Sequence, residues 1–293
     1  MRKAKTASIL LFVVSLALFL FCIFVREGGQ DQSGPEIQMD QQEIQASITA
    51  DDATLLQGVT ATDRKDGDVT DSLVVESLSN FIEKGRRKMS IVAFDSDNHV
   101  TRAEREIVYT DYTSPVFTLD GPLRFSLDDE SLTEGLHAQD CLDGDITGKI
   151  QVNFQDNITY DSAGQYQVTF SVANSAGDVK NLPVTIEIYD PAQENSTQTP
   201  SLTLSEYLVN LSVGEGFDPW NYLESVTVNF YEYVKGEDGV LRGNLADEIL
   251  DPSAVQIENP VDTNTPGVYE VVYSIYDEEG VQGTVRLIVS VNG

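Results

Sequence analysis

Two groups of three aspartates are the residues whose types and spacing are best suited to chemistry. They are Asp63, Asp66 and Asp68, and, at the same spacing, Asp140, Asp143 and Asp145. A glycine precedes the last aspartate of each group, so the chain can turn tightly around the carboxylates. Oxygen ligands on a tight turn suit a hard cation such as calcium, with a Kd of about 10⁻⁴ to 10⁻³ M in extracellular modules. Asp-Gly is also a preferred turn dipeptide that needs no metal, so a purely structural turn is the open alternative.

A cluster of aromatic residues near the C-terminus is the second candidate site. Its members are Trp220, Tyr222, Tyr231 and Tyr233, with Phe230 beside them. Exposed, they could form a platform for a carbohydrate; buried, they would be core residues, as aromatic residues in strands often are. The surrounding region, 231–244, has no counterpart in the earlier repeats described below. We therefore predict that this part of the chain is the divergent, partner-facing one.

Composition and motifs exclude other functions. His99 and His137 lack the paired ligands or nucleophile of a zinc site or a catalytic triad. The sequence has no Gly-x-Ser-x-Gly motif, phosphate loop or Cys-x-x-Cys motif, so we predict that the protein is not an enzyme. The net charge of −30 excludes nucleic acid as a partner, because binding to phosphates requires a basic surface.

The elements that must position these residues occur three times. Three glycines, Gly85, Gly164 and Gly267, each lie ten residues before a turn. The turns are Asp95–Asn98, Asn174–Gly177 and Asp277–Gly280. Between each glycine and its turn the apolar residues alternate, in the sets Met89, Ile91, Ala93; Val168, Phe170, Val172; and Val271, Tyr273, Ile275. Alternation with a period of two predicts half-buried strands, and each turn ends in a residue that tolerates a positive φ.

Three prolines, Pro35, Pro115 and Pro200, open the successive repeats, at intervals that indicate tandem domains. The predicted domains are 35–112, 113–190 and 200–293, and the predicted linkers are 26–34 and 191–199. Strand-forming runs separated by Asp, Gly and Asn indicate that each domain is an all-β sandwich.

A longer motif supports this fold. The block Gly58–Thr70 matches Gly135–Thr147, and Gly-x-Tyr follows at Gly164–Tyr166 and Gly267–Tyr269. The pattern resembles bacterial immunoglobulin-like (Ig-like) domains of the kind named after a pesticidal crystal protein, and is similar to hyalin-repeat and cadherin-like modules. The third repeat lacks the Asp-Gly-Asp block, and Arg87 stands where the other repeats have tyrosine. The resemblance covers residues 35–293 and implies a family of surface modules and spacers; it does not fix a function.

The N-terminal segment 7–25 is apolar and contains no charged residue. Nineteen residues in a helix can cross a hydrocarbon core, and the basic residues Arg2, Lys3 and Lys5 precede them. Bulky residues fill the end of the segment, where signal-peptide cleavage prefers small ones. We therefore expect a cytoplasmic tail at 1–6, an uncleaved transmembrane anchor at 7–25 and the domains outside the plasma membrane.

These observations predict a bacterial, single-pass, membrane-anchored surface protein. Three tandem Ig-like sandwiches would serve adhesion or protein interaction, through an unknown protein or a cell-wall glycan. Two alternatives stay open: a structural or assembly component of the envelope, and a carbohydrate-binding module of the cell surface. Calcium is the only cofactor that the sequence suggests.

Overall fold

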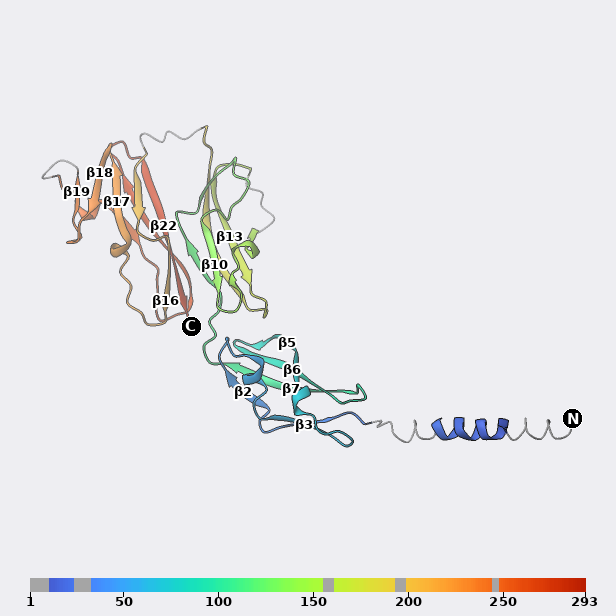
Figure 1. Cartoon of the computed structure of the whole chain (residues 1–293). Coiled ribbons are helices and arrows are strands. Elements are labelled where there is room, and N and C mark those ends of the chain that lie inside the picture. The colour runs from blue at the N-terminus through green and yellow to red at the C-terminus, as the bar shows by residue number, and fades with distance from the viewer. Residues whose placement is uncertain (1–10, 24–32, 155–160, 193–198, 244–247) are drawn as a thin grey trace. The chain divides into compact units, whose positions relative to one another are not determined.

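The computed structural model describes residues 11–23, 33–154, 161–192, 199–243 and 248–293 (Figure 1). It divides into two compact units, Met1–Tyr112 and Thr113–Gly293. The described part of the chain is nearly all β, as the sequence predicts. Most residues of the predicted linkers, 26–32 and 193–198, lie outside the described ranges, as does the predicted cytoplasmic tail.

The first unit contains one module, β1–β7, with two sheets. The smaller sheet has the order β1 (Glu36–Met39), β3 (Val59–Asp63), β4 (Gly67–Asp68). The larger sheet has the order β2 (Glu43–Ala46), β7 (Val100–Tyr109), β6 (Arg86–Phe94), β5 (Val74–Glu83). A short helix, α2 (Asp52–Leu55), and a 3-10 turn, η1 (Thr70–Ser72), connect them. Residues of both sheets share one hydrophobic core, which makes the module a sandwich.

The second unit contains two further modules. One sheet of the second module has the strand order β8 (Val116–Leu119), β10 (Leu136–Asp140), β11 (Gly144–Asp145). The other sheet has the order β9 (Arg124–Ser126), β14 (Val179–Tyr189), β13 (Gly164–Ala173), β12 (Gln151–Phe154). One sheet of the third module has the strand order β15 (Ser201–Leu204), β17 (Leu223–Val228), β18 (Tyr231–Lys235), β19 (Leu241–Gly243). The other sheet has the order β16 (Leu208–Ser212), β22 (Gln282–Asn292), β21 (Gly267–Tyr276), β20 (Gln256–Glu258). The 3-10 turns are η2 (Thr147–Lys149), η4 (Pro219–Tyr222) and η5 (Pro252–Ala254).

The three predicted repeats form equivalent strands, β6, β13 and β21. Every member of the three alternating apolar sets is at most 2% exposed, because the even spacing turns these side chains toward the core. The turns that follow contain the expected left-handed residues, Asn98 (φ 66°), Gly177 (φ 83°) and Gly280 (φ 84°). The sequence predictions of these strands and turns are therefore confirmed.

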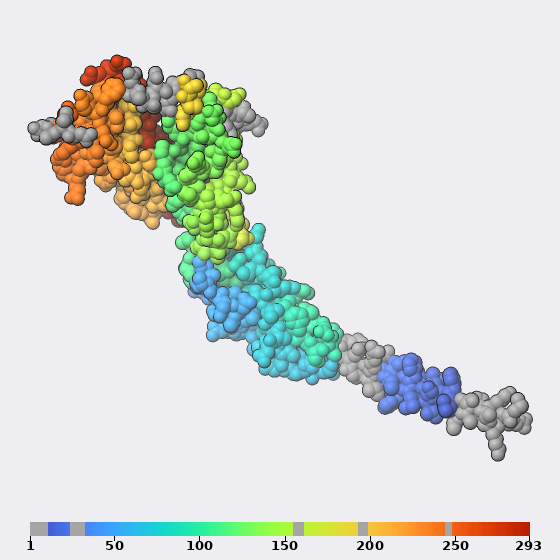
Figure 2. Space-filling model, turned by 45° about the horizontal axis from the view of Figure 1, so that its top comes forward, coloured from blue at the N-terminus to red at the C-terminus, as the bar shows by residue number. Residues whose placement is uncertain are grey.

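The second and third modules pack against each other within the second unit. Leu208 and Ile288 of the third module are buried in the hydrophobic cluster of the second. Asn210 Nδ2 donates to the carbonyl of Phe117 at 3.0 Å, and Arg286 donates to Gln165 Oε1 at 2.9 Å. The two modules adjoin in both views of the molecule (Figures 1 and 2). They therefore form one continuous body.

At the N-terminus, residues 11–23 form a helix. Within the described ranges, no helix has both the length and the apolar character needed to cross a membrane. The other residues of the predicted anchor, 7–10 and 24–25, are not among those that the structure describes.

Candidate functional site

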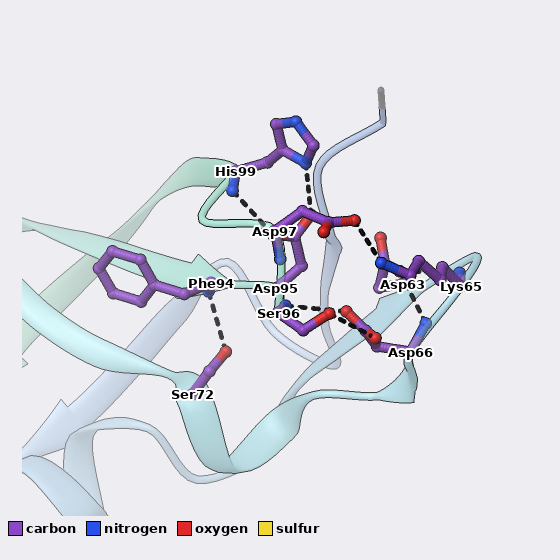
Figure 3. Close-up of polar contacts among 9 residues, drawn as sticks. All are labelled: Asp63, Lys65, Asp66, Ser72, Phe94, Asp95, Ser96, Asp97 and His99. Atoms are coloured by element: carbon purple, nitrogen blue, oxygen red, sulfur yellow. Dashed lines mark hydrogen bonds and ion pairs between the residues drawn. The ribbon is translucent and has the colours of Figure 1, made fainter. Parts of the chain in front are cut away.

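The first aspartate group lies on the turn between β3 and β4. Asp63 ends β3, and its Oδ1 accepts the backbone N–H groups of Lys65 (2.8 Å) and Asp66 (2.9 Å), which closes the turn. The Asp66 carboxylate reaches across to the turn between β6 and β7, where it accepts from the N–H and the hydroxyl of Ser96, both at 2.8 Å (Figure 3). Asp66 thus joins two turns that are thirty residues apart in sequence.

The second group repeats this arrangement on the turn between β10 and β11. Asp140 Oδ1 accepts from the N–H groups of Leu142 (2.9 Å) and Asp143 (3.0 Å). Asp143 accepts from the N–H (2.7 Å) and the hydroxyl (2.5 Å) of Ser175, and from Lys149 Nζ (2.9 Å). Burial raises the pKa of Asp143, but the hydrogen bonds from Lys149 and Ser175 outweigh it and the pKa is lowered.

The last aspartates of the two groups have a local role. Asp68 accepts from the N–H of Thr70 at 3.0 Å, and Asp145 accepts from the N–H of Thr147 at 2.9 Å, at the starts of η1 and η2. Hydrogen bonds from these threonines lower the pKa of both carboxyl groups. Each carboxylate thus satisfies the N–H of the first residue of its 3-10 turn, from the position before the N-cap residue.

In both groups the first and last aspartates accept hydrogen bonds from their own loop, and the middle one accepts from the serine of the neighbouring turn, which supports the structural-turn alternative. Among the described residues, no three or more His, Cys, Asp or Glu side chains are arranged to hold a metal ion. Calcium binding by the full triads stays a prediction.

The two groups differ in one contact. In the second module, Asn174 Nδ2 donates to Asp140 Oδ2 at 3.1 Å. In the first, Asp63 Oδ2 is buried and has no hydrogen-bond partner. Asp95 stands at the position of Asn174 and contacts His99 Nδ1 through its own Oδ2 at 2.6 Å. Burial raises the pKa of Asp95, whereas the backbone and ring N–H groups of His99 lower it, and the net shift is downward.

Three of the four predicted ligand-facing aromatic residues pack against the core of the third module. Trp220 donates from Nε1 to the carbonyl of Gly239 at 3.3 Å, and Tyr222 stacks on Phe217 with ring centroids 5.6 Å apart. Burial raises the pKa of both Tyr222 and Tyr233. Tyr231 is 50% exposed. These residues do not form a single open platform, because Trp220 and Tyr222 of η4 and Tyr233 of β18 pack against the core.

The most exposed aromatic side chain of the third module is Phe230, at 75%. It lies in the two-residue loop between β17 and β18, where Asn229 (φ 51°) and Phe230 (φ 66°) both have left-handed backbone conformations. The side chain of Asn229 accepts from the N–H of Glu278 at 3.3 Å, so this loop lies beside the turn between β21 and β22. Sequence reasoning named Phe230 only as a neighbour of the aromatic cluster. The available signal for a tight hairpin was Asn229, at the first position of a two-residue loop between two strand-forming runs.

The two histidines each contact an aspartate. His99 contacts Asp95 as described, and His137 Nε2 lies 2.9 Å from Asp120 Oδ2. Both are on the surface of their modules, with side chains 37% and 45% exposed.

Comparison with known proteins agrees with this architecture. Residues 236–291 match the family model described as "Bacterial surface protein, Ig-like domain". The chain is 29% identical over 241 residues to the pesticidal crystal protein Cry22Aa of Bacillus thuringiensis, an alignment that covers 80% of this chain and 30% of that protein. It is 26% identical over 163 residues to an uncharacterized 81.3 kDa protein of Acholeplasma phage L2, covering 56% of this chain and 19% of that one. The chain thus spans less than a third of the length of either relative.

Among solved structures, the chain is similar to Drosophila N-cadherin EC1-4, with 11% identity, 90% of this chain and 76% of that chain covered, and a TM-score of 0.22. The family match and the similarity to Cry22Aa confirm the predicted resemblance to bacterial Ig-like domains. Ig-like domains of this kind are typically non-catalytic surface modules.

Proposed function

We propose that this chain is a bacterial surface protein, anchored in the plasma membrane by its N-terminal segment, whose third module binds a protein partner or another cell. Its modules share the repeated sandwich design of the family that it resembles, and its strong negative charge favours a solvated surface. The third module departs most from the repeat and carries the feature that best supports a binding role.

That feature is the strained loop of Phe230. Positive φ at both central residues defines a type I′ hairpin turn, whose second position usually holds glycine. A left-handed conformation costs a residue with a Cβ about 1–2 kcal/mol. No core packing offsets this cost, because the ring is 75% exposed. A strained, exposed aromatic residue is more easily explained by a contact with a partner than by folding.

A pull-down from intact cells tests the binding role. The purified chain is compared with Phe230→Ser and with Val234→Ser, which removes another exposed apolar side chain (47% exposed) from the adjacent strand. We expect Phe230→Ser to lose cell binding and Val234→Ser to keep it. Equal binding by all three proteins would contradict a role for this loop.

Carbohydrate binding is the second candidate, because the half-exposed Tyr231 lies directly beside Phe230. Purified cell-wall glycan, free of protein, separates the two candidates. Retention of the chain on this glycan, with loss on Phe230→Ser, would favour the carbohydrate function over the protein-binding one.

The proposed anchor rests on the uncharged segment 7–25 and on its described part. Every residue from 11 to 23 is exposed in the helix, including Leu11 (74%) and Phe12 (66%), so no other described part of the chain covers these apolar side chains. Deletion of 7–25 should release the protein from carbonate-washed membranes, and protease added outside intact cells should digest the modules of the full chain. Release of the undeleted chain, or protection of its modules, would contradict the anchor.

An assembly role in the envelope makes a different prediction. If the anchor itself recognises a membrane partner, replacing 7–25 with an unrelated transmembrane helix should abolish partner binding. Under the adhesion proposal the replacement should leave cell binding unchanged.

A further inference from the structure

The larger sheet of the first module ends in a long strand that has a neighbour on one side only. β5 is the last strand in the order β2, β7, β6, β5, and within the described residues it pairs only with β6 (Figure 1). It is ten residues long, whereas the described strands at this position in the other two modules, β12 and β20, have four and three residues. The outer row of backbone N–H and C=O groups of β5 is therefore available to another strand.

The side chains of β5 do not protect this edge. A short strand, a lysine or a proline is among the usual means by which an edge strand avoids pairing, and β5 has none of them. Val74, Leu78 and Ile82 are instead exposed, at 46%, 37% and 49%. The described strands β12 and β20 expose no large apolar side chain. A long edge with exposed apolar side chains thus distinguishes the first module from the other two.

The edge is also nearly neutral in a strongly acidic chain. The net charge of the chain is −30, yet the segment Val74–Ile82 contains one charged residue, Glu76. Arg102 donates to the Glu76 carboxylate from Nε and Nη2 at 2.7–3.0 Å, and the Ser90 hydroxyl donates to it at 2.9 Å. Two copies of so acidic a chain repel each other over most of their surface, so they approach most easily where the charge is neutralised.

The classes of residue along this edge follow the same order in both directions. From either end the segment has two apolar residues, a polar residue, a serine and a central leucine: Val74-Val75-Glu76-Ser77-Leu78-Ser79-Asn80-Phe81-Ile82. An antiparallel pair of β5 strands centred on Leu78 therefore places every residue opposite one of its own class. Leu78 meets Leu78 of the second copy, Val74 meets Ile82, and the glutamate meets an asparagine rather than another carboxylate. A two-fold interface requires this self-complementarity.

The irregularities of β5 are compatible with such a pair. The register of β5 against β6 shifts between Val75 and Ser77 and again between Leu78 and Phe81. These two stretches face each other when two copies pair about Leu78, so a bend in one strand meets a bend in the other. A third shift, between Phe81 and Glu83, lies at the end of the pair. Bulges increase the twist of a strand, and a copy related by a two-fold axis has the same twist.

We propose that β5 is a self-association surface, through which two copies of the chain pair their β5 strands antiparallel about a two-fold axis at Leu78. The pairing joins the two four-stranded sheets into one continuous sheet. One strand and its neighbouring side chains bury less than about 1,200 Å² in total, a size that is typical of weak contacts. The dimer should therefore form only at high protein concentration. This inference does not depend on the proposed role of the third module.

Cysteine pairs test the register directly. The background is a chain with Cys22→Ser and Cys141→Ser, which removes both native thiols. In this background Leu78→Cys should form a disulfide-linked dimer on mild oxidation, because the residue meets its own copy at the axis. Val74→Cys alone should not, since its two copies lie about 26 Å apart in this pairing, eight residues at about 3.3 Å each. A mixture of Val74→Cys and Ile82→Cys should give the linked heterodimer.

Sedimentation equilibrium of the full chain in detergent, from micromolar to near-millimolar concentration, measures the association itself. Leu78→Lys places a charge at the axis and should keep the chain monomeric. Val179→Lys is the matched control, because it makes the same change at a side chain of β14 that is 54% exposed, and it should dimerise like the wild type. Any association through the N-terminal helix would be equal in both variants.

Three results would overturn the proposal. The first is a wild-type chain that stays monomeric over the whole concentration range, which would leave β5 without a second copy as its partner. The second is association of Leu78→Lys to the same extent as the wild type. The third is cross-linking of Val74→Cys alone as efficiently as Leu78→Cys, which would show that contact between copies does not follow the proposed register.

Discussion

Replacing Asp143 with alanine should destabilise the second unit through the link between its two turns. The substitution removes the bonds from the N–H and hydroxyl of Ser175, at 2.7 and 2.5 Å, and the ion pair with Lys149 at 2.9 Å. A hydrogen bond to a charged group contributes about 1.5–3 kcal/mol, and the low end applies here because water can reach the loop. The ion pair adds little, since the Lys149 side chain is 52% exposed.

The free energy of unfolding should therefore fall by about 2–3 kcal/mol, which corresponds to two hydrogen bonds that each contribute about 1–1.5 kcal/mol. For a unit of this size each kcal/mol lowers the Tm by about 2–4 °C, so the transition should fall by about 5–10 °C. Thermal unfolding of the full chain followed by circular dichroism measures the shift. Lys149→Ala is the control that removes only the exposed ion pair. A Tm for Asp143→Ala within a degree of that control would refute the link as a source of stability.

Three further predictions concern the second unit. Tyr273→Phe should lower the stability of the third module by about 0.5–1.5 kcal/mol, because the buried hydroxyl donates to the Pro219 carbonyl at 2.7 Å; fluorescence of the neighbouring Trp220 during urea unfolding measures it. Acid should weaken the second module: the pKa of Asp143 lies below its ordinary value of 3.8, so its contribution is present above that value and is lost as the pH falls below it. The urea midpoint of unfolding should therefore fall less steeply with decreasing pH for Asp143→Asn than for the wild type. Parallel curves for the two proteins would show that this carboxyl group does not cause the loss of stability in acid. Leu208→Ala should cost about 2–5 kcal/mol, because Leu208 is 7% exposed and packs in the core of the second module. A change confined to the Trp220 signal, with the second module unaffected, would contradict the shared core.

Local sequence patterns predicted the strands and turns that depend on neighbouring residues. Alternating apolar residues indicated β6, β13 and β21 because side chains in a strand point to opposite faces. The glycine or asparagine at the end of each turn was recognisable because few other residues adopt a positive φ. Both signals lie within about ten residues of chain, which is the range over which a sequence pattern specifies geometry.

Contacts between distant segments were not predictable in the same way. The bonds between Asp66 and Ser96 join turns thirty residues apart, and nothing in either turn specifies the other. The parallel pairing of β16 with β22, which brings Leu208 beside Ile288, depends on the assembled sheet. Burial likewise separates aromatic residues that look alike in sequence: Tyr233 lies against the core, whereas Phe230 projects from a turn.

Adhesion by a Phe230→Gly variant tests the central claim most directly. Glycine relieves the left-handed strain and forms an Asn-Gly type I′ turn, so the variant should be about 1 kcal/mol more stable than the wild type. The full chain and the variant are displayed on a non-adherent bacterial host at equal surface density, and the cells retained on a target layer are counted. The account predicts that the more stable variant loses adhesion. Wild-type adhesion by the variant, or no adhesion by either protein, would contradict the claim that the third module binds through this loop.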